Sequence, residues 1–275
     1  MKIIFYGTRG SVPVSDPEFM EFGGNTTCLF ISGIDEGFGT IIMDAGTGIR
    51  KLGKDISLGK VETGDEISLG FTHFHWDHIQ GFPFFDPAYN PQSKLHISTA
   101  GRRKIENLKD IFSAQMQSTY FPVQLENMGA QIEFEKYNTN VVVGEKGALA
   151  TVIDVQHPGG CIAVRFHFNE KAMVFCTDVE HPNGIDEKVV KLATNADVLI
   201  HEAQYTDEEL ESHKGWGHSS YSQAIEVAER SNAKQLIITH HDPDHDDDFL
   251  RKMERKCQQY FKDLLFARDG YELNF

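Results

Sequence analysis

Short apolar segments rich in β-branched residues recur along this chain and alternate with segments of helical periodicity. This alternation predicts an α/β architecture, in which strands and helices pack as layers. The predicted strands cover residues 3–6, 28–32, 40–44, 66–72, 95–99, 150–155, 161–168, 172–177, 198–201 and 235–239. The predicted helices cover residues 102–116, 220–231 and 247–261. Ser219 or Ser220 is expected to cap the second of these helices.

The composition predicts a single large hydrophobic core. The 275 residues are 40% hydrophobic and include no Pro- or Ser-rich linker, so we expect one domain over residues 1–275. There is no run of 18 apolar residues, and the chain opens on a strand, which predicts neither a membrane span nor a secretory leader. The four cysteines lack C-x-x-C spacing, which predicts buried free thiols in a reducing cytoplasm.

The charge of the chain disfavours an extended polyanionic partner. There are 41 acidic against 26 basic residues, which gives a formal net charge of −15. So acidic a surface repels phosphate backbones and removes the nonspecific attraction that nucleic-acid-binding proteins use. The basic residues cluster on the polar face of the first predicted helix, at Arg102, Arg103, Lys104 and Lys109. We therefore expect a small substrate, no extended nucleic acid and no membrane, and a homodimer stays open.

The densest group of metal-ligating side chains is Thr72-His73-Phe74-His75-Trp76-Asp77-His78, which follows an apolar run. If that run is a strand, His73, His75 and Asp77 point the same way as the chain leaves the sheet, because strand side chains alternate. Imidazole and carboxylate suit zinc, and a tetrahedral ion takes only four ligands. The surplus of ligands suggests two ions. A solvated His-rich loop and a single structural zinc are the alternatives.

Three further candidate ligands, His157, Asp178 and His240, each come directly after an apolar segment. The ends of neighbouring strands meet at one edge of a sheet, so these side chains are expected to converge. His241 adjoins His240. Because adjacent strand residues face opposite ways, only one of the two should be a ligand.

This set of motifs, in this order, resembles the metallo-β-lactamase superfamily. The resemblance implies a four-layer αβ/βα sandwich, with two sheets face to face and helices outside. It also implies two Zn²⁺ ions, with Mn²⁺ or Fe²⁺ as alternatives. The first ion would be held by His73, His75 and His157, and the second by Asp77, His78 and His240. Asp178 would bridge the two ions. The resemblance also selects His240 over His241 as the ligand. Histidine at position 75 resembles the zinc hydrolases, whereas the diiron oxidoreductases have glutamate there. Asp44 is expected to hold the metal loop by hydrogen bonds.

Such a centre predicts hydrolysis. Two zinc ions about 3.5–4 Å apart hold a bridging water and lower its pKa toward about 7, which gives hydroxide at neutral pH. Asp77 would orient that hydroxide and, being ionised, cannot be the acid. His218, in Gly215-Trp216-Gly217-His218-Ser219-Ser220, is the candidate to protonate the leaving group or to bind phosphate. On local sequence alone, a loop histidine beside a helix cap is the simpler interpretation.

A second resemblance favours the role in catalysis. Residues 171–240 are similar to the ribonuclease Z branch of the superfamily, in VFCTD (174–178), DVLIHEA (197–203), HSS (218–220) and IITH (237–240). That branch cleaves phosphodiesters, and its histidine in a His-Ser-Thr motif matches His218. His201 and Glu202 match its His-Glu-Ala pair and would orient ligands. Thr177 and Ser220 depart from the Gly and Thr that are usual there.

The N-terminal segments 7–13 and 23–28 resemble phosphodiesterase-type metallohydrolases that act on cyclic nucleotides or related cyclic phosphates. The first segment would be a turn that places Arg9 near an anion. His181 is a further candidate for substrate contact. The candidate pocket walls that would stack a base are Phe82, Phe84, Phe85, Tyr89, Tyr120 and Phe121.

The sequence thus predicts a cytoplasmic binuclear zinc phosphodiesterase acting on a small phosphodiester, such as a cyclic nucleotide. One alternative is a ribonuclease Z-like endonuclease that processes the 3′ end of transfer RNA. That enzyme grips its substrate with a basic arm, and no comparable insertion lies between His157 and His240. A carbon-ester hydrolase, a lactonase or thioesterase, would use the same metals. A degenerate metal-binding or sensor module is disfavoured because all seven ligand positions are filled.

Overall fold

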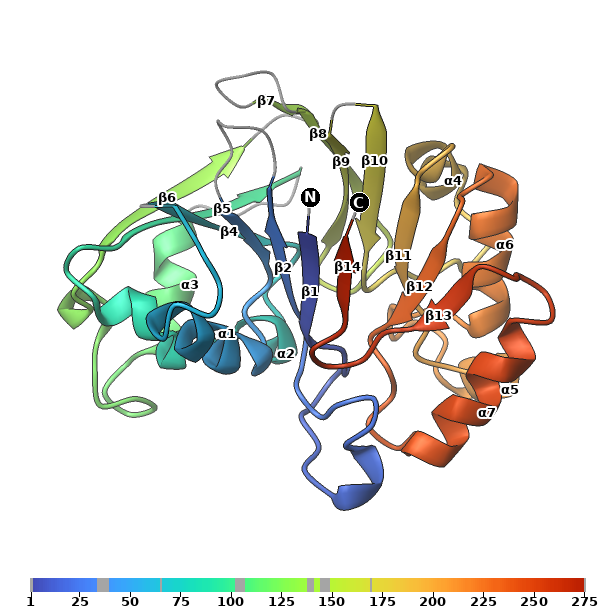
Figure 1. Ribbon diagram of the computed structural model, residues 1–275, viewed down its shortest axis with the longest axis horizontal. Helices are drawn as coiled ribbons and strands as arrows, with labels where there is room; N and C mark the ends of the chain where they lie inside the picture. The colour runs from blue at the N-terminus through green and yellow to red at the C-terminus, as the bar shows by residue number, and fades with distance from the viewer. Residues whose placement is uncertain are drawn as a thin grey trace.

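The computed structural model describes residues 2–33, 40–64, 66–101, 107–137, 141–143, 149–168 and 170–274. In these residues the strands form two seven-stranded sheets that pack face to face, with helices on the outer face of each (Figure 1). The predicted four-layer α/β sandwich is therefore confirmed. All four cysteines are buried and free, also as predicted.

The first sheet has the strand order β14-β1-β2-β3-β4-β5-β6. Its strands are β1 (Lys2–Gly7), β2 (Cys28–Ser32), β3 (Thr40–Met43), β4 (Glu66–Phe71), β5 (Lys94–Ala100), β6 (Gln131–Tyr137) and β14 (Glu272–Asn274). The neighbours from β14 to β3 are antiparallel, and those from β3 to β6 are parallel. The outer face has the helices α1 (Gly48–Ser57), α2 (Trp76–Ile79) and α3 (Leu108–Gln115), and the 3₁₀ turns η2 (Phe82–Phe84), η3 (Asp86–Tyr89) and η4 (Leu125–Asn127).

The second sheet has the order β13-β12-β11-β10-β9-β8-β7. Its strands are β7 (Val141–Val143), β8 (Leu149–Val155), β9 (Cys161–Phe168), β10 (Lys171–Cys176), β11 (Val198–Glu202), β12 (Leu236–Thr239) and β13 (Leu264–Phe266). Strands β7 to β10 are antiparallel neighbours, and β10 to β13 are parallel. The remaining helices are α4 (Glu187–Ala193), α5 (Asp207–Ser212), α6 (Tyr221–Ser231) and α7 (Asp247–Cys257), with η1 (Pro17–Phe19) before β2.

Three clusters of buried apolar side chains join the four layers. The cluster between the sheets includes Phe5 and Leu29 of the first sheet with Phe175 and Ile200 of the second. The other two pack each sheet against its own helices. Strands buried on both faces need apolar residues at nearly every position, which explains the continuous apolar runs in the sequence. Among the described residues, no helix is both long and apolar enough to cross a membrane.

All ten predicted strands are present, and each boundary agrees with the prediction to within one residue. Helix α6 begins at Tyr221, with Ser220 as N-cap in a capping box with Gln223. The predicted third helix ends at Cys257 instead of residue 261. Of the predicted helix 102–116, α3 covers Leu108–Gln115. The basic residues Arg102, Arg103 and Lys104 lie outside the described residues.

Several short elements escaped the sequence pattern, namely β6, β7, β13, β14, α1, α2, α4 and α5. Helix α1 contains Gly48 and Gly53, which lower helix propensity. Both glycines are needed for close packing, because a Cβ on Gly48 would lie 2.3 Å from the Tyr6 carbonyl oxygen and one on Gly53 would lie 2.9 Å from the Asp86 nitrogen. Sequence alone does not reveal such packing.

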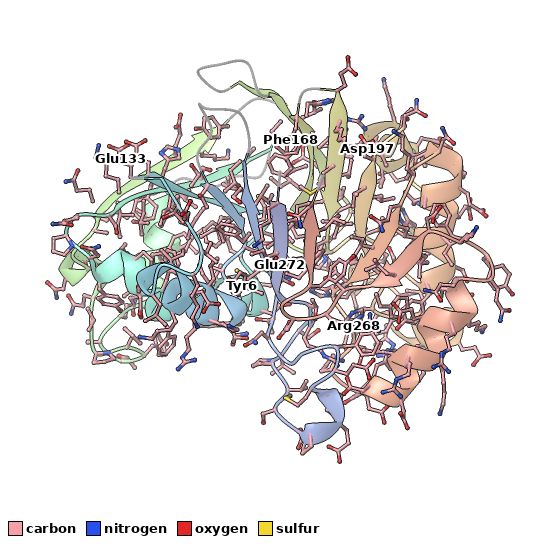
Figure 2. All side chains as sticks on the ribbon, viewed as in Figure 1. Tyr6, Glu133, Phe168, Asp197, Arg268 and Glu272 are labelled. Atoms are coloured by element: carbon pink, nitrogen blue, oxygen red, sulfur yellow. The ribbon has the colours of Figure 1, made fainter. Side chains whose placement is uncertain are left out.

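The carboxyl ends of the parallel strands in both sheets lie on the same side of the molecule. The opposite side is marked in Figure 2 by Phe168, which ends β9, and Asp197, which precedes β11. There the Asp197 carboxylate accepts a hydrogen bond from the Ala172 backbone nitrogen at 2.8 Å. The loops that follow β3, β4, β10 and β12 are therefore brought together at one edge of the sandwich.

The segment after β1 connects the loops of the two sheets at this edge. The Thr8 nitrogen donates to the Asn25 carbonyl at 2.9 Å on the first-sheet side. On the other side, the His241 nitrogen donates to the Thr8 carbonyl and the Gly10 nitrogen donates to the His241 carbonyl, both at 2.9 Å. This exchange of backbone hydrogen bonds fixes the loop after β12 relative to β1.

Arg9 reinforces the same junction with its side chain, which is fully buried. Its Nε donates to the Gly23 carbonyl at 2.7 Å, and its Nη1 donates to the carbonyls of Asp242 and His245 at 2.9 and 2.7 Å. The expectation that Arg9 lies near a bound anion is therefore wrong, because its guanidinium is turned inward to backbone oxygens. Its role is to hold the two halves of the edge together.

We expect Arg9→Met to lower the free energy of unfolding by about 3 kcal/mol, because two buried carbonyls and one partly buried carbonyl would lose their donor. Equilibrium urea denaturation measures this effect. Arg50→Met is the matched control, since Arg50 lies exposed on α1. Equal denaturation midpoints for the two variants would contradict the structural role of Arg9.

Candidate metal centre

Two groups of His and Asp side chains converge at the edge formed by the loops after β4, β8, β10 and β12. The first group is His73, His75, His157 and Asp178, and the second is Asp77, His78, Asp178 and His240. Within each group, the ligand atoms all lie within 4.8 Å of one another. The structure therefore brings together all seven residues that the sequence predicts as ligands, and divides them in the expected way.

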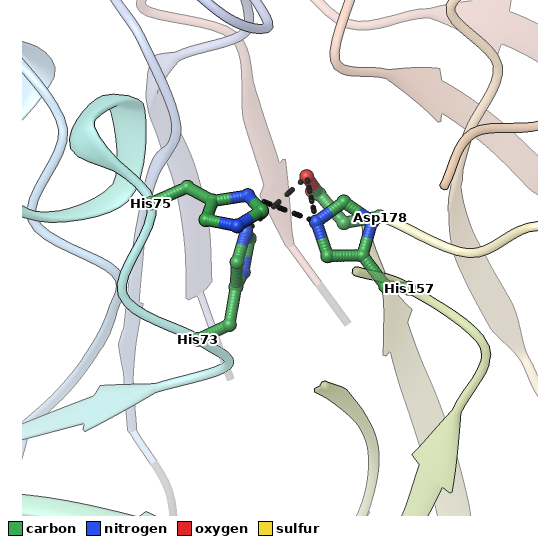
Figure 3. A group of neighbouring side chains, drawn as sticks. All are labelled: His73, His75, His157 and Asp178. Atoms are coloured by element: carbon green, nitrogen blue, oxygen red, sulfur yellow. Dashed lines mark hydrogen bonds and ion pairs between the residues drawn. The ribbon is translucent and has the colours of Figure 1, made fainter. Parts of the chain in front are cut away.

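In the first group, the imidazoles approach one another from both sheets (Figure 3). His75 Nδ1 lies 3.0 Å from His157 Nε2. Asp178 Oδ2 lies 3.4 Å from His73 Nε2 and 3.8 Å from His157 Nε2. His75 is exposed and the other three are buried, so the group opens to solvent on the side of His75.

The second group is buried throughout. His240 Nε2 lies 3.2 Å from Asp77 Oδ2 and 3.3 Å from Asp178 Oδ1. His78 Nε2 lies 3.3 Å from His240 Nε2 and 3.3 Å from Asp178 Oδ1. Asp178 thus turns Oδ2 to the first group and Oδ1 to the second, which is the arrangement that a bridging carboxylate requires.

Three of the imidazoles donate their Nδ1–H to an acceptor outside the groups. The pairs are His78 with Asp44 Oδ2 (2.9 Å), His157 with the Gly217 carbonyl (2.8 Å) and His240 with Gln204 Oε1 (3.1 Å). A donor at Nδ1 leaves the lone pair at Nε2, and Nε2 is the atom that faces the group. These contacts therefore set both the tautomer and the direction of each ring.

Asp44 also holds the loop after β4, as the sequence predicts. Its Oδ1 accepts from the Thr72 nitrogen and its Oδ2 from the Thr72 hydroxyl, both at 2.8 Å. With the contact to His78, the carboxylate joins the beginning and the end of the motif. Gln204, by contrast, was not predicted, because nothing in its local sequence marks it as an acceptor for a histidine 36 residues away.

The backbone is strained at the residues that supply these groups. Asp44, Asp178 and His240 have φ values of 60°, 48° and 60°, in the left-handed region that favours glycine. All three lie just beyond the end of a strand, where the chain must turn sharply to direct a side chain across the edge. Such strain persists only where surrounding contacts stabilise it, and it is concentrated at functional sites.

Side chains of the first motif do not alternate as in a strand beyond Phe71, where β4 ends, so the predicted common direction of His73, His75 and Asp77 is wrong. Helix α2 begins at Trp76, so the directions of the later side chains are set by a loop and a helical turn instead of a pleat. His73 and His75 consequently face the first group, whereas Asp77 faces the second. The sequence pattern identified the side chains that converge, but a loop and a helical turn, and not a strand, bring them together.

Burial and charge set the protonation states within the groups. Burial lowers the pKa values of His73 and His157, so both rings are neutral near pH 7. Burial alone would raise the pKa of Asp178, but the neighbouring His240 and His78 hold it well below its usual range. Burial alone would lower the pKa of His78, but the carboxylates of Asp178 and Asp77 raise it well above its usual range. Because a metal ion binds neutral imidazole and ionised carboxylate, His78 would release a proton on metal binding.

The residues present fit a divalent metal. His73 Nε2 is buried and makes no hydrogen bond within the described part of the chain. Leaving such a nitrogen without a partner costs free energy, and a cation between the converging atoms would supply the partner. Imidazole with carboxylate is also the ligand chemistry of borderline divalent ions.

Residues 40–241 match the family model described as the β-lactamase superfamily domain. The chain belongs to this superfamily. Two relatives from the ribonuclease Z-like branch match over nearly the whole of both chains. Ribonuclease BN of Proteus mirabilis is 23% identical, with 98% of each chain covered, and Ribonuclease Z of Archaeoglobus fulgidus is 26% identical, with 99% of this chain and 97% of the relative covered.

Solved structures of the superfamily show the same fold. The metallo-β-lactamase fold protein YhfI from Bacillus subtilis aligns with a TM-score of 0.71 at 18% identity and 99% coverage of both chains. The short form of human tRNase Z aligns with a TM-score of 0.68 at 18% identity, over 100% of this chain and 99% of that one. A diphosphatase from the PhnP family aligns with a TM-score of 0.68 at 19% identity, over 100% and 97%.

His218 lies beside both groups of this superfamily member. Its ring centroid is 5.4 Å from that of His157 and 5.1 Å from that of His240. Its Nδ1 lies 3.3 Å from Glu202 Oε1. Burial would lower the pKa of His218, but the ion pair with Glu202 raises it to about 9. The ring is therefore protonated at neutral pH, with Nε2–H directed away from Glu202.

Glu202 is fully buried and is itself held by the backbone. Its Oε1 accepts from the nitrogens of Val179 and Ser219 at 3.1 and 2.9 Å, and its Oε2 accepts from that of Gln204 at 3.1 Å. These contacts connect the loops after β10 and β11 to the loop of His218. Glu202 is thus an orienter, as its match to the His-Glu-Ala motif predicts, and the residue it orients is His218.

The expectation that His201 orients a ligand has no support, because its contacts within the described residues are with Glu202 and His181 and not with either group. Its Nδ1 lies 2.5 Å from the Glu202 carbonyl, and its ring stacks on His181 with centroids 5.8 Å apart. His181 in turn accepts from the Asp186 nitrogen at 3.1 Å, and burial lowers its pKa to about 4. These two histidines form a buried pair of their own, which does not place His181 toward a substrate.

Among the other candidates, His241 faces away from the groups and lies 2.9 Å from the Ala267 carbonyl. Phe82 and Phe85 are fully buried in the core beneath α1, so they cannot stack on a substrate. The exposed candidates are Phe84, which packs edge-on against Phe121, and Tyr120 and Tyr89. The two tryptophans, Trp76 and Trp216, were not among the predicted pocket walls and are 65% and 61% exposed.

We expect Asp178→Asn to remove more metal than His75→Ala, because Asp178 belongs to both groups and His75 to one. Metal per chain in the purified protein, determined by plasma mass spectrometry, measures this. His96→Gln is the control, since His96 lies on β5 outside both groups. An unchanged metal content in Asp178→Asn would contradict the shared role of its carboxylate.

Proposed function

We propose that this protein is a metal-dependent phosphodiesterase that hydrolyses small phosphodiesters, with cyclic nucleotides as the favoured class. The observation that carries the proposal is the position of His218, whose Nδ1 lies 3.3 Å from Glu202 Oε1 and whose ring lies beside both ligand groups. A protonated imidazole so placed suits an oxyanionic leaving group or a phosphoryl oxygen. The names of the ribonuclease relatives support phosphodiester chemistry.

The two groups would hold two zinc ions, with Mn²⁺ or Fe²⁺ as alternatives. His73, His75 and His157 would bind the first, and Asp77, His78 and His240 the second, with Asp178 shared. When bound, such ions activate a water molecule and polarise a phosphoryl oxygen. The tautomers fixed by Asp44, Gln204 and the Gly217 carbonyl keep the Nε2 lone pairs available for this purpose.

Asp77 is suited to orient the attacking water. Burial alone would raise its pKa, but His78 and His240 hold the pKa well below its usual range, so the carboxylate is ionised and can only accept hydrogen bonds. Its Oδ2 accepts from the Ser11 nitrogen at 2.8 Å, which fixes its direction. An ionised carboxylate cannot protonate a leaving group, and this leaves the role of acid to His218.

His218 would donate its Nε2 proton to the leaving oxygen. Nδ1 faces Glu202, so the proton available for transfer is on the opposite side of the ring. Water adds to phosphorus and releases one proton to solvent, the bond from phosphorus to the leaving oxygen breaks, and the proton from His218 converts that oxygen to a hydroxyl. His218 then regains a proton from solvent. The products are a phosphomonoester and an alcohol, which remain one molecule when the substrate is cyclic.

The size of the substrate separates this proposal from its nearest rival, a transfer RNA 3′ endonuclease. The relatives' names favour RNA, and the net charge of −15 disfavours it. The alignment with Ribonuclease BN extends over 323 residues, more than the 275 of this chain, so that relative has segments absent here. These differences favour a mononucleotide- or dinucleotide-sized phosphodiester. Cytoplasmic location and homodimer formation remain predictions.

A panel of substrates tests the proposal with purified protein of known metal content. We expect turnover of bis-p-nitrophenyl phosphate and of a 2′,3′- or 3′,5′-cyclic nucleotide, and negligible cleavage of precursor transfer RNA. Specific cutting of that precursor at its 3′ trailer by nanomolar enzyme would establish the endonuclease instead. Faster turnover of a lactone or thioester than of every phosphodiester would establish the carbon-ester hydrolase.

The role of His218 has its own test. We expect His218→Ala to retain its metal and to lose roughly 10²–10⁴-fold in turnover of a phosphodiester with a poor leaving group. A p-nitrophenolate leaving group needs no proton, so the turnover of such a substrate should fall less. Equal losses for both leaving groups would remove the acid role and leave positioning or phosphate binding.

A further inference from the structure

The two tryptophans of this chain are both exposed beside the metal groups, although aromatic side chains usually bury much of their surface. Trp76 begins α2 and directly follows His75. Trp216 directly precedes Gly217, whose carbonyl accepts the Nδ1–H of His157 at 2.8 Å. Consecutive Cα atoms are about 3.8 Å apart, so each tryptophan is attached within one residue of the site.

The chain segments that contain the two tryptophans reach the site from opposite sides. Helix α2 lies with the first sheet, and the connection from α5 to α6, which includes Trp216, lies with the second (Figure 1). The two sides meet where His75 Nδ1 lies 3.0 Å from His157 Nε2. His75 is the exposed ligand of the first group, so this junction is also where the group opens to solvent.

The loop of Trp216 has a fixed conformation. Glu180 is buried, and its two carboxylate oxygens accept from the nitrogens of Gly215 and Gly217 at 2.7 and 3.1 Å. Both glycines have positive φ, at 85° and 92°, which turns the chain sharply on either side of Trp216. The indole is therefore presented to solvent by a defined loop.

A row of aromatic rings connects Trp216 with His218. The Trp216 ring lies edge-on to His213, with centroids 4.8 Å apart. His213 stacks on Tyr205 at 4.4 Å, and the Tyr205 ring lies 6.0 Å from that of His218. Tyr205 is buried, so the row packs beneath the surface and ends at the exposed indole. These ring contacts fix the position of Trp216 relative to His218.

We propose that Trp76 and Trp216 form the aromatic walls of a subsite that stacks the base of a small nucleotide phosphodiester. This inference rests on the phosphodiesterase activity proposed above. A nucleobase presents a flat π-face, and stacking on an exposed aromatic ring needs no particular hydrogen-bonding pattern. The subsite thus selects for the presence of a base and tolerates different bases.

Two cyclic phosphates that differ in the base test this directly. We expect the wild-type protein to prefer 2′,3′-cyclic AMP over the base-free glycerol 1,2-cyclic phosphate. Trp216→Ala and Trp76→Ala should each reduce this preference roughly tenfold, through a higher KM for the nucleotide and not a lower kcat. Trp216→Phe should recover part of the loss. Tyr260→Ala is the control, because Tyr260 is an exposed aromatic at the end of α7. An unchanged preference in both tryptophan variants would overturn the subsite.

A fluorescence measurement separates this inference from the proposed activity. Because the chain has two tryptophans, Trp76→Phe leaves Trp216 as the single indole, and Trp216→Phe leaves Trp76. We expect adenosine 5′-monophosphate, but not ribose 5-phosphate, to quench both single-tryptophan proteins saturably. If neither cyclic phosphate is hydrolysed, the proposed activity is wrong, and quenching by adenosine 5′-monophosphate alone would still support the subsite. Equal quenching by the two monophosphates, or none by either, would overturn the subsite whatever the activity.

Discussion

The buried carboxylate of Asp178 is the group on which the rest of this edge depends. It is the one side chain shared by the two ligand groups, and it approaches imidazoles from both sheets. An ionised carboxylate away from water is costly unless positive charge or hydrogen bonds compensate it. Thr177 donates a hydrogen bond to Oδ1 at 2.5 Å, and the surrounding histidines supply the remainder. The convergence of four loops supplies these partners and so keeps the ionised form of the buried carboxylate stable.

The sequence was most informative where local pattern and local structure coincide. The ten predicted strands have strong apolar runs, and the candidate ligands follow strands whose ends meet at one edge. The prediction of very short strands failed for a physical reason. Strands β13 and β14 have three residues each, and they are stabilised by pairing with neighbouring strands, which the local sequence pattern does not include. Strand β6 is different, because QIEFEKY alternates apolar and polar residues, and that signal was overlooked.

The errors within the site have a common cause. Arg9, Phe82 and His201 have side chains that can bind a ligand, and their sequence contexts suggested that they do. Whether such a side chain faces the site or the interior depends on packing between segments far apart in the chain. Arg9, for example, is turned inward by carbonyls of residues 242 and 245. Residue type and the positions of strand ends therefore predicted which candidate ligands converge, and predicted the direction of the loop side chains poorly.

The hydrogen bond from His157 to the Gly217 carbonyl has a further consequence, which concerns thermodynamic linkage. This single contact joins a ligand of the first group to the loop between α5 and α6. Anything that orders the His157 ring must also favour the present conformation of that loop, and anything that orders the loop must favour the ring. Linkage of this kind is reciprocal, so a molecule that binds the loop would raise the affinity of the first group for a metal ion by the same factor as the ion raises the affinity for that molecule. Metal affinity and binding at the loop would then report one coupling free energy.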